Sequence, residues 1–364
     1  MTAPLAIRHE PNPSPASREH VAAVLSHPGF GRFFSDHMFV AYWTPEDEWH
    51  DARVTAYGTI SLDPATAVLH YAQEIFEGLK AYRHADGSVW TFRPEVNAAR
   101  FQRSARRLAL PSLPADDFVS AIDALVRADL AWVPGEGEGE KSLYIRPFMF
   151  ASEVFLGVRP ACHVTFSVIA SPAGAYFPGG VRPVSIWLSE EFTRAARGGT
   201  GAAKCGGNYA ASLLPQREAS ANGCDQVVFL DAVESHWVEE LGGMNIYFVY
   251  ADGSFVTPEL TGSILEGVTR DSILTLAATA GYKVEERKVD IDEWRDGVVS
   301  GEISEVFACG TAAVITPVGS LKWRGGEVSM GDETGSVTMQ IRDSLLDIQY
   351  GRAEDTYGWL HRVA

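Results

Sequence analysis

The sequence predicts an α/β fold divided into two domains. The chain has 364 residues, of which 46% are apolar, and this length allows each of two domains to bury its own core. Three glycines and two prolines between Pro172 and Gly180 forbid regular structure and mark a boundary. Beyond that boundary, strand patterns and helix patterns alternate along the chain, as they do in α/β domains.

The N-terminal part is expected to hold a tail and a smaller α/β domain. Residues 1–20 carry several prolines and serines with little apolar periodicity, so we expect a loose tail or an arm over a partner subunit at 1–27. The small domain is expected at 28–173. Its expected helices are Asn97–Leu110, which ends at Pro111, and Asp116–Trp132. Its expected strands are Met38–Trp43, Gly58–Leu62, Val89–Phe92, Ser142–Ala151 and His163–Ser171.

A larger second domain is expected at 184–364, after an interdomain linker at 174–183. Its length of about 180 residues is ordinary for one domain. The expected strands are Val184–Leu188, Asp225–Asp231, Asn245–Tyr250 and Glu305–Cys309. The expected helices are Asn208–Ala221, Val268–Gly281, Ile291–Ser300 and Thr338–Tyr350.

The charge balance disfavours several classes of partner. Thirty Lys and Arg residues against 47 Asp and Glu residues give a formal net charge of −17, which repels nucleic-acid backbones and anionic lipids. No window reaches the ~18 consecutive apolar residues of a membrane span, and the N-terminus lacks the apolar core of a signal peptide. We therefore expect a cytoplasmic protein that binds neither nucleic acid nor membranes.

The metal-binding residue types are scattered. Cys162, Cys205, Cys224 and Cys309 form no C-x-x-C pair, and no two histidines stand at the spacing of a helical ligand pair. The sequence therefore predicts no metal site, and the cysteines are expected to be buried reduced thiols.

Lys204 has an unusual neighbourhood for a lysine. Small residues flank it throughout 198–207, and they leave room for a flat ligand beside the amine. A partly desolvated lysine amine can attack a carbonyl carbon, so the segment indicates a Schiff-base lysine. An exposed lysine in a glycine-rich loop is equally consistent with the local sequence. A Walker A phosphate loop is not, because Ala203-Lys204-Cys205 lacks the required glycine and hydroxyl.

A Schiff-base lysine implies pyridoxal phosphate or a carbonyl substrate, and the cofactor needs further partners. Gly262–Arg270 leads into a predicted helix whose N-terminus favours an anion such as phosphate. Arg100 could add bidentate phosphate contacts, with competitors at Arg103, Arg106 and Arg107. Either Glu239 or Glu240 could hold the pyridine nitrogen. Taken singly, each of these residues is more often a surface charge.

Several ordered motifs resemble those of fold-type IV pyridoxal-phosphate enzymes and, among these, of branched-chain amino acid aminotransferases. The motifs are Tyr71-Ala-Gln-Glu-Ile-Phe-Glu-Gly-Leu-Lys80, Ser142-Leu-Tyr-Ile-Arg-Pro147, Gly174-Ala-Tyr-Phe-Pro-Gly-Gly180, Ala202-Ala-Lys-Cys-Gly-Gly-Asn-Tyr209, Glu240-Leu-Gly-Gly-Met-Asn245, Leu265-Glu-Gly-Val-Thr-Arg270, Cys309-Gly-Thr-Ala312 and Ile348-Gln-Tyr-Gly351. The resemblance covers roughly residues 28 to 364. It implies the two-domain fold-type IV architecture, with a smaller N-terminal domain and a larger domain that binds pyridoxal 5'-phosphate.

The resemblance also implies roles for individual residues. Lys204 would be the catalytic lysine that binds the cofactor covalently, Glu240 the partner of the pyridine nitrogen, and Tyr209 a contact of the ring hydroxyl. The remaining cofactor positions, near the phosphate, are Arg100, Val268, Thr269 and Thr311. The substrate positions are Phe34, Tyr71, Phe76, Tyr144, Arg146, Leu156, Val158, Tyr176, Thr311 and Ala312, with Leu156 and Val158 in a loop that reaches across a dimer interface. Without the resemblance, the aromatic residues would be read as ordinary core.

The activity implied by the resemblance is amino transfer between leucine, isoleucine or valine and 2-oxoglutarate, by a homodimer with ping-pong kinetics, in branched-chain amino acid biosynthesis or breakdown. Arg146 matches the position that meets the distal carboxylate of glutamate, although a structural arginine is the competing interpretation. A D-amino-acid aminotransferase or an aminodeoxychorismate lyase shares the fold. A nucleotide-binding α/β protein that uses 198–207 as a phosphate loop is a more distant alternative.

Two positions depart from the pattern of the family. Gly243 replaces a threonine that some members carry, so Gly243 is not expected to bind the cofactor. Ala313 and Thr316 stand where animal members carry a C-x-x-C redox pair, so that switch is expected to be absent.

Overall fold

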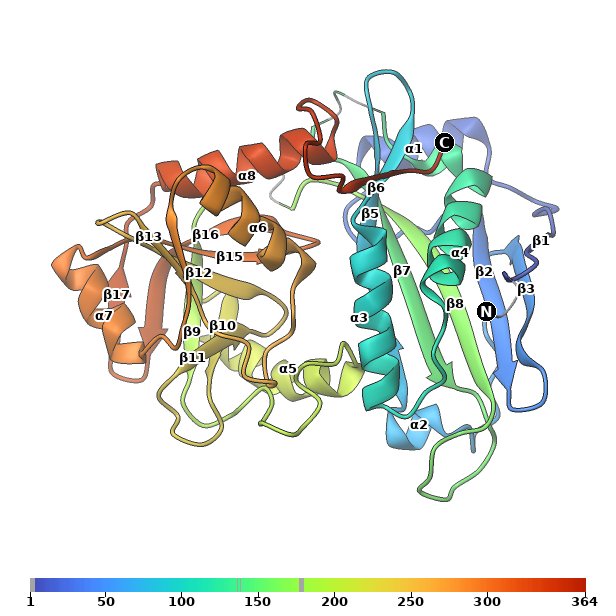
Figure 1. Cartoon of the computed structure of the whole chain (residues 1–364), viewed down its shortest axis with the longest axis horizontal. Coiled ribbons are helices and arrows are strands. Elements are labelled where there is room, and N and C mark those ends of the chain that lie inside the picture. The colour runs from blue at the N-terminus through green and yellow to red at the C-terminus, as the bar shows by residue number, and fades with distance from the viewer. Residues whose placement is uncertain (1–3, 136, 138, 177–179) are drawn as a thin grey trace. The chain divides into compact units, whose positions relative to one another are not determined.

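The computed structural model describes residues 4–135, 137, 139–176 and 180–364. Within this part of the chain, two compact units each contain one nine-stranded sheet. The first unit comprises Met1–Pro178, Ala203–Gly206 and Asp347–Ala364, and the second comprises Gly179–Ala202 and Gly207–Leu346. Figure 1 shows the helices and strands coloured along the chain. The α/β fold predicted from the sequence is confirmed.

The first unit is built on a mostly antiparallel sheet with the strand order β1-β3-β2-β8-β7-β5-β6-β18, in which β4 pairs with β7. Its strands are β1 (Arg8–His9), β2 (His37–Thr44), β3 (Glu48–Ala56), β4 (Glu74–Phe76), β5 (Leu79–Arg83), β6 (Val89–Phe92), β7 (Ser142–Ala151), β8 (Val164–Ala173) and β18 (Leu360–Arg362). Strands β7 and β8 pair over their whole length, from Ser142 opposite Ala173 to Ala151 opposite Val164. This long pair provides a rigid base for the side chains of β7.

Two amphipathic helices, α3 (Pro94–Arg107) and α4 (Ala115–Ala128), cover one face of this sheet (Figure 1). Helix α3 has a proline at its first position, where the missing N–H costs nothing. The apolar stripe of α4 includes Phe118 and Ile122, which are at most 1% exposed and belong to the core of the first unit. The remaining helices of this unit are α1 (Arg18–Ser26), α2 (Val68–Tyr71) and the short 3₁₀ turn Leu130–Trp132.

The N-terminal residues differ from the expected loose tail. Strand β1 pairs in parallel with β3, and α1 buries Val21 and Val24 against the core of the first unit. Ser17 caps α1 by accepting a hydrogen bond from the backbone N–H of His20. A two-residue strand and a nine-residue helix are too short for a periodic pattern to stand out, so the sequence did not reveal them.

One expected strand was wrong. Gly58–Leu62 forms no strand, and β3 lies just before it and pairs with β2 as a hairpin. The polar residues Glu48 and Asp51 obscure the alternation of β3, and both have positive φ angles, which are uncommon away from turns.

The second unit holds a mixed sheet with the order β11-β10-β9-β16-β15-β12-β13-β14, in which β17 pairs with β16. Its strands are β9 (Val184–Ser189), β10 (Gln226–Leu230), β11 (Val238–Leu241), β12 (Asn245–Tyr250), β13 (Ser254–Thr257), β14 (Lys283–Glu286), β15 (Ile303–Gly310), β16 (Val314–Trp323) and β17 (Gly326–Ser329). The helices in this half of the chain are α5 (Gly206–Ala221), α6 (Val268–Thr279), α7 (Ile291–Ser300) and α8 (Ser336–Gln349). Stacked rings of Tyr247 and Phe307 lie in its core.

Two stretches that follow the expected domain boundary belong to the first unit. Strand β18 pairs antiparallel with β6, with Leu360 opposite Phe92. Ala203 and Cys205 are buried in the core of the first unit. The expected linker includes residues 177–179, which lie outside the described residues. Within the described ranges, the structure contains no helix with the length and apolar character needed to cross a membrane.

Candidate active site

Lys204 lies in a short segment that the first unit holds by its backbone. The N–H of Lys204 donates to Ser104 Oγ at 2.9 Å, and its carbonyl oxygen accepts from the N–H of Phe76 at 3.0 Å. The Lys204 Nζ lies 5.0 Å from the centre of the Phe76 ring. Gly206 donates its N–H to the Glu74 carboxylate. The amine is therefore carried on a fixed backbone.

A buried ion pair lies close to this lysine. Arg100 Nε and Nη2 donate to the two carboxylate oxygens of Glu77, each at 2.7 Å, and both residues are at most 3% exposed. Burial opposes the charge of Glu77, but Arg100, with a smaller contribution from Lys204, holds the pKa of Glu77 below its usual range. Glu77 lies within one of the motifs named above, but the sequence predicted no role for it. Its partner Arg100 is distant in sequence and meets it only in the folded chain.

Arg146 joins the same cluster from β7. Its guanidinium carbon lies 4.7 Å from the Phe76 ring centre and 5.4 Å from that of Tyr144, and Nη2 donates to the Tyr144 hydroxyl at 3.0 Å. Arg146 Nε is buried and has no hydrogen-bond partner among the described residues. An unpartnered buried donor is costly, so this guanidinium is suited to receive an acceptor from a ligand. The structure thus brings Phe76, Tyr144, Arg146 and Lys204 together.

The other predicted substrate residues of the first unit lie toward its surface. The Phe34 ring stacks on Tyr57 with centres 5.0 Å apart, and the Tyr71 hydroxyl donates to the carbonyl oxygen of Leu156. The exposed fractions are 39% for Tyr71, 43% for Tyr176, 63% for Leu156 and 88% for Val158. For the two tyrosines, these values rule out the interpretation as ordinary core.

In the second unit, Glu240 lies on β11 and is held by three donors. Arg194 Nη1 lies 2.7 Å from Glu240 Oε1, and the N–H of Leu265 donates to the same oxygen at 2.8 Å. Asn245 Nδ2 donates to Oε2 at 3.3 Å. The side chains of Glu240 and Arg194 are both 2% exposed, so the pair is buried. The sequence did not single out Arg194, because its partner Glu240 lies far along the chain.

Asn245 connects Glu240 to the start of α6. Its Nδ2 also donates to the carbonyl oxygen of Leu265 at 3.0 Å, and its Oδ1 lies where a Cβ on Gly267 would be. Gly267 is the N-cap of α6 and has no side chain to cap the helix. The first amides of a helix lack intrahelical acceptors, so those of Val268 and Thr269 are suited to an anion.

Three further predicted residues lie on segments next to this region. Asn245 pairs with Cys309 across β12 and β15, and the turn between β15 and β16 carries Thr311 and Ala312. The Tyr209 ring lies beside the loop that follows β11, 3.6 Å from the position of a Cβ on Gly243. A carboxylate, a helix N-terminus, a turn and a tyrosine therefore lie near one end of β12. These donors and the acidic group are the kinds of partner that pyridoxal phosphate requires.

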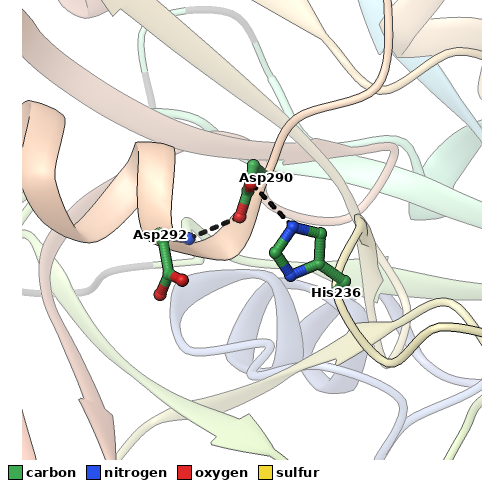
Figure 2. A group of neighbouring side chains, drawn as sticks. All are labelled: His236, Asp290 and Asp292. Atoms are coloured by element: carbon green, nitrogen blue, oxygen red, sulfur yellow. Dashed lines mark hydrogen bonds and ion pairs between the residues drawn. The ribbon is translucent and has the colours of Figure 1, made fainter.

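The structure groups three possible metal ligands that the sequence did not. His236, Asp290 and Asp292 place one ligand atom each within 4.8 Å of one another. Figure 2 shows that Asp290 already contacts both of its neighbours: its Oδ2 lies 2.7 Å from His236 Nε2, and its Oδ1 accepts from the Asp292 N–H at 2.8 Å. Because Asp290 is also the N-cap of α7, these contacts have a structural use in starting that helix.

The cysteines follow the expectation at three of four positions. Cys205, Cys224 and Cys309 are buried, whereas Cys162 is exposed in the loop between β7 and β8, so the prediction of a buried thiol was wrong there. Burial raises the pKa of Cys309, which keeps its thiol protonated and unreactive.

Comparisons with known proteins identify the family of the chain. The family model described as Amino-transferase class IV matches residues 74–321. The chain is 62% identical over 365 residues to a Streptomyces coelicolor protein named "Probable branched-chain-amino-acid aminotransferase", with 100% of both covered. It is 56% identical over 364 residues to the branched-chain-amino-acid aminotransferase of Mycolicibacterium smegmatis, with 99% of both covered.

Solved structures of branched-chain amino acid aminotransferases have the same fold. The Escherichia coli enzyme matches with a TM-score of 0.74 at 30% identity, over 90% of this chain and 99% of that chain. The Thermobaculum terrenum enzyme in its PLP-form matches with a TM-score of 0.70 at 26% identity, over 90% of this chain and 98% of that chain. With most of its length matched by the family model and by these relatives, the chain belongs to the class IV aminotransferases and is similar there to branched-chain-amino-acid aminotransferases.

Proposed function

We propose that this protein uses pyridoxal 5'-phosphate to move the amino group of L-leucine, L-isoleucine or L-valine to 2-oxoglutarate. The observation that carries the proposal is Lys204, whose backbone is fixed on both sides while its amine faces the Phe76 ring and the buried Arg100–Glu77 pair. The names of the relatives support the choice of substrates. When bound, the cofactor supplies an electron sink for negative charge that develops at the substrate Cα.

Lys204 has two tasks in this proposal. Its amine would hold the cofactor covalently and, when free, would accept and return the Cα proton as a general base. The two backbone hydrogen bonds of Lys204 fix the origin of the side chain, so the amine needs to rotate only about its own side-chain bonds between the two tasks.

The other cofactor residues supply charge where the ring and the phosphate require it. Glu240 would accept the N–H of the protonated pyridine ring, while Arg194 compensates the carboxylate charge in its dry surroundings. Tyr209 would donate to the ring hydroxyl. Arg100, Thr311 and the amides of Val268 and Thr269 would bind the phosphate.

The substrate residues fall into an aromatic group and one cation. Phe76 and Tyr144, with Phe34, Tyr71 and Tyr176, would contact an uncharged branched side chain. Arg146 would bind the distal carboxylate of glutamate or 2-oxoglutarate, because its Nε is a buried donor without a partner in the described structure. Thr311 and Ala312 would lie near the substrate α-carboxylate.

The proposal also includes the assembly and the location. The exposed apolar side chains of Leu156 and Val158 lie on a loop that a second copy of the chain would cover in a homodimer. The protein would act in the cytoplasm.

A substrate screen tests the function. The purified protein with added pyridoxal phosphate is incubated with 2-oxoglutarate and each of L-leucine, L-isoleucine, L-valine, D-alanine and D-leucine, and glutamate is measured. We expect turnover with the three L-amino acids, none with the D-amino acids, and almost none in Lys204→Ala. Turnover confined to D-amino acids would show a D-amino-acid aminotransferase, and no turnover at all would contradict the proposal.

A further inference from the structure

A cavity in the second unit is lined by Val238 and Glu239 of β11, by the segments 231–237 and 258–264, and by Arg197 and Lys288. Its volume is about 550 Å³, which is in the range of small-molecule sites. Glu239 lines it, whereas Glu240 is the next residue on the strand. Because successive side chains of a strand point to opposite faces, Glu239 and Glu240 serve different surroundings.

Two side chains of the cavity wall carry buried polar atoms without a hydrogen-bond partner in the part of the chain that the structure describes. Glu239 is 5% exposed, and burial raises the pKa of its carboxyl, which interacts with the side chains of Ser263 and Thr261. Its Oε1 accepts from Ser263 Oγ, and its Oε2 is buried without a hydrogen-bond partner among the described residues. Trp237 Nε1 is likewise buried and unpartnered. One atom is an acceptor and the other a donor, so a ligand that satisfies both would need a donor group and an acceptor group.

Asp231, a second acid of the cavity wall, has all the hydrogen-bond donors that Glu239 Oε2 lacks. Asp231 accepts hydrogen bonds from the backbone N–H groups of Val233, Glu234, His236 and Trp237 at 2.8–3.0 Å. Burial opposes its charge, but these four donors lower the pKa of Asp231 to about 2. Asp231 therefore fixes the 231–237 loop as a wall of the cavity, and Glu239 remains the buried acid that is available to a ligand.

The rest of the wall indicates the other parts of the ligand. Arg197 and Lys288 are exposed cations on the cavity, and Glu234 and Glu259 are exposed acids on it. Lys288 Nζ lies 4.8 Å from the centre of the Trp237 ring, so the place beside Trp237 is where the wall favours a carboxylate. Val233 and Leu260 are apolar wall residues with exposed fractions of 84% and 41%. They would cover an apolar side chain.

We propose that this cavity is a second binding site, which takes a free α-amino acid with an apolar side chain. The ammonium group donates to Glu239 Oε2, and the carboxylate accepts from Trp237 Nε1 and is attracted by Arg197 and Lys288. The amino acid is bound without chemical change, since the described residues of the cavity wall include no lysine other than the exposed Lys288. This site is separate from the amino-acid site that the proposed function requires.

The test uses L-leucine as the probe and the borohydride-treated holoprotein, in which a cofactor bound to lysine can no longer exchange with an amino acid. Isothermal titration calorimetry is compared for wild type, Glu239→Gln and the control Glu302→Gln, which removes an exposed acid of the same unit outside the cavity. We expect one leucine per chain in the wild type and the control. Glu239→Gln should weaken binding at least tenfold, and Trp237→Phe, which keeps the ring but removes the N–H, at least threefold.

Absence of binding at 10 mM leucine, or equal affinity in wild type and both cavity variants, would overturn the proposal. If Glu239→Gln does not fold, the affinity of Trp237→Phe for leucine still decides the test. A crystal of treated protein with leucine bound away from the cavity would also contradict it. The proposed function fails if borohydride labels no lysine or if the substrate screen finds no turnover of L-amino acids, whereas the cavity proposal fails only on the binding data of its own variants, so the two failures are distinguishable.

Discussion

Glu240→Gln is the substitution that most clearly separates a catalytic role from a structural one. Glutamine keeps the shape of the side chain and removes its charge, so a protonated pyridine nitrogen would lose a charge-assisted partner. Losing such an interaction in a dry site costs about 2–4 kcal/mol of transition-state stabilisation. We therefore expect removal of the substrate Cα proton to slow by about 30- to 1000-fold, with the cofactor still bound.

The same substitution also has a structural cost that can be estimated. Glu240 and Arg194 are 2.7 Å apart and both are 2% exposed, so glutamine leaves a buried guanidinium without its counter-charge. Breaking a buried pair costs about 3–5 kcal/mol, whereas replacing both members by uncharged residues is often neutral. We expect the double variant Arg194→Met with Glu240→Gln to regain part of the lost stability without regaining the rate.

The assay is a stopped-flow half-reaction with L-leucine and with leucine deuterated at Cα, followed by cofactor absorbance, together with urea unfolding of each variant. Glu239→Gln is the matched control, because it changes the adjacent residue of the same strand. We expect the control to react at nearly the wild-type rate. A wild-type rate in Glu240→Gln, with a slow reaction in Glu239→Gln, would refute the assignment of the pyridine partner.

Four other outcomes are expected. Arg100→Met should lower the free energy of unfolding by about 3–5 kcal/mol in urea, because the buried Glu77 loses its guanidinium counter-charge; an unchanged midpoint would contradict this. The pKa of Glu77 in the folded protein is held below its ordinary value of 4.5. The stability that this carboxylate contributes is therefore present above about pH 4.5 and is lost as the pH falls through the lower folded pKa. Thermal unfolding of Glu77→Gln should depend less on acid pH than that of the wild type. Arg146→Met should slow the glutamate half-reaction ~10- to 100-fold and that of leucine much less, and a uniform loss would indicate a purely structural arginine. Diamide should produce no reversible intramolecular disulfide, because Ala313 and Thr316 stand in place of a C-x-x-C pair and Cys309 is buried; a disulfide found by mass spectrometry whose formation tracks activity would contradict this.

The sequence was most informative where an apolar run is bounded by turn residues. The expected strands Val89–Phe92, Ser142–Ala151 and Asn245–Tyr250 and the helix Ile291–Ser300 agree with the structure at both ends. These segments are long or strongly buried, so local propensity and tertiary burial favour the same conformation. The ordered motifs around Lys204 were equally informative about the family.

The sequence was least informative where distant residues meet. Pairing of β18 with β6 joins residues 360–362 to 90–92, and no local pattern encodes that contact. The same limit applies to the partners of predicted residues: Glu77 beside Arg100 and Arg194 beside Glu240 are neighbours only in the folded chain. The cavity beside Glu239 is also formed by segments that lie far apart in sequence.

The central claim is that Lys204 binds the cofactor, and borohydride trapping tests it most directly. The purified holoprotein is reduced with borohydride, which converts a lysine–cofactor C=N bond into a stable amine, and is then digested and mapped by mass spectrometry. We predict a phosphopyridoxyl group on Lys204, none on Lys80 or Lys322, and none at this position in Lys204→Ala. A phosphopyridoxyl group on another lysine, or an unmodified Lys204 in catalytically active protein, would contradict the claim.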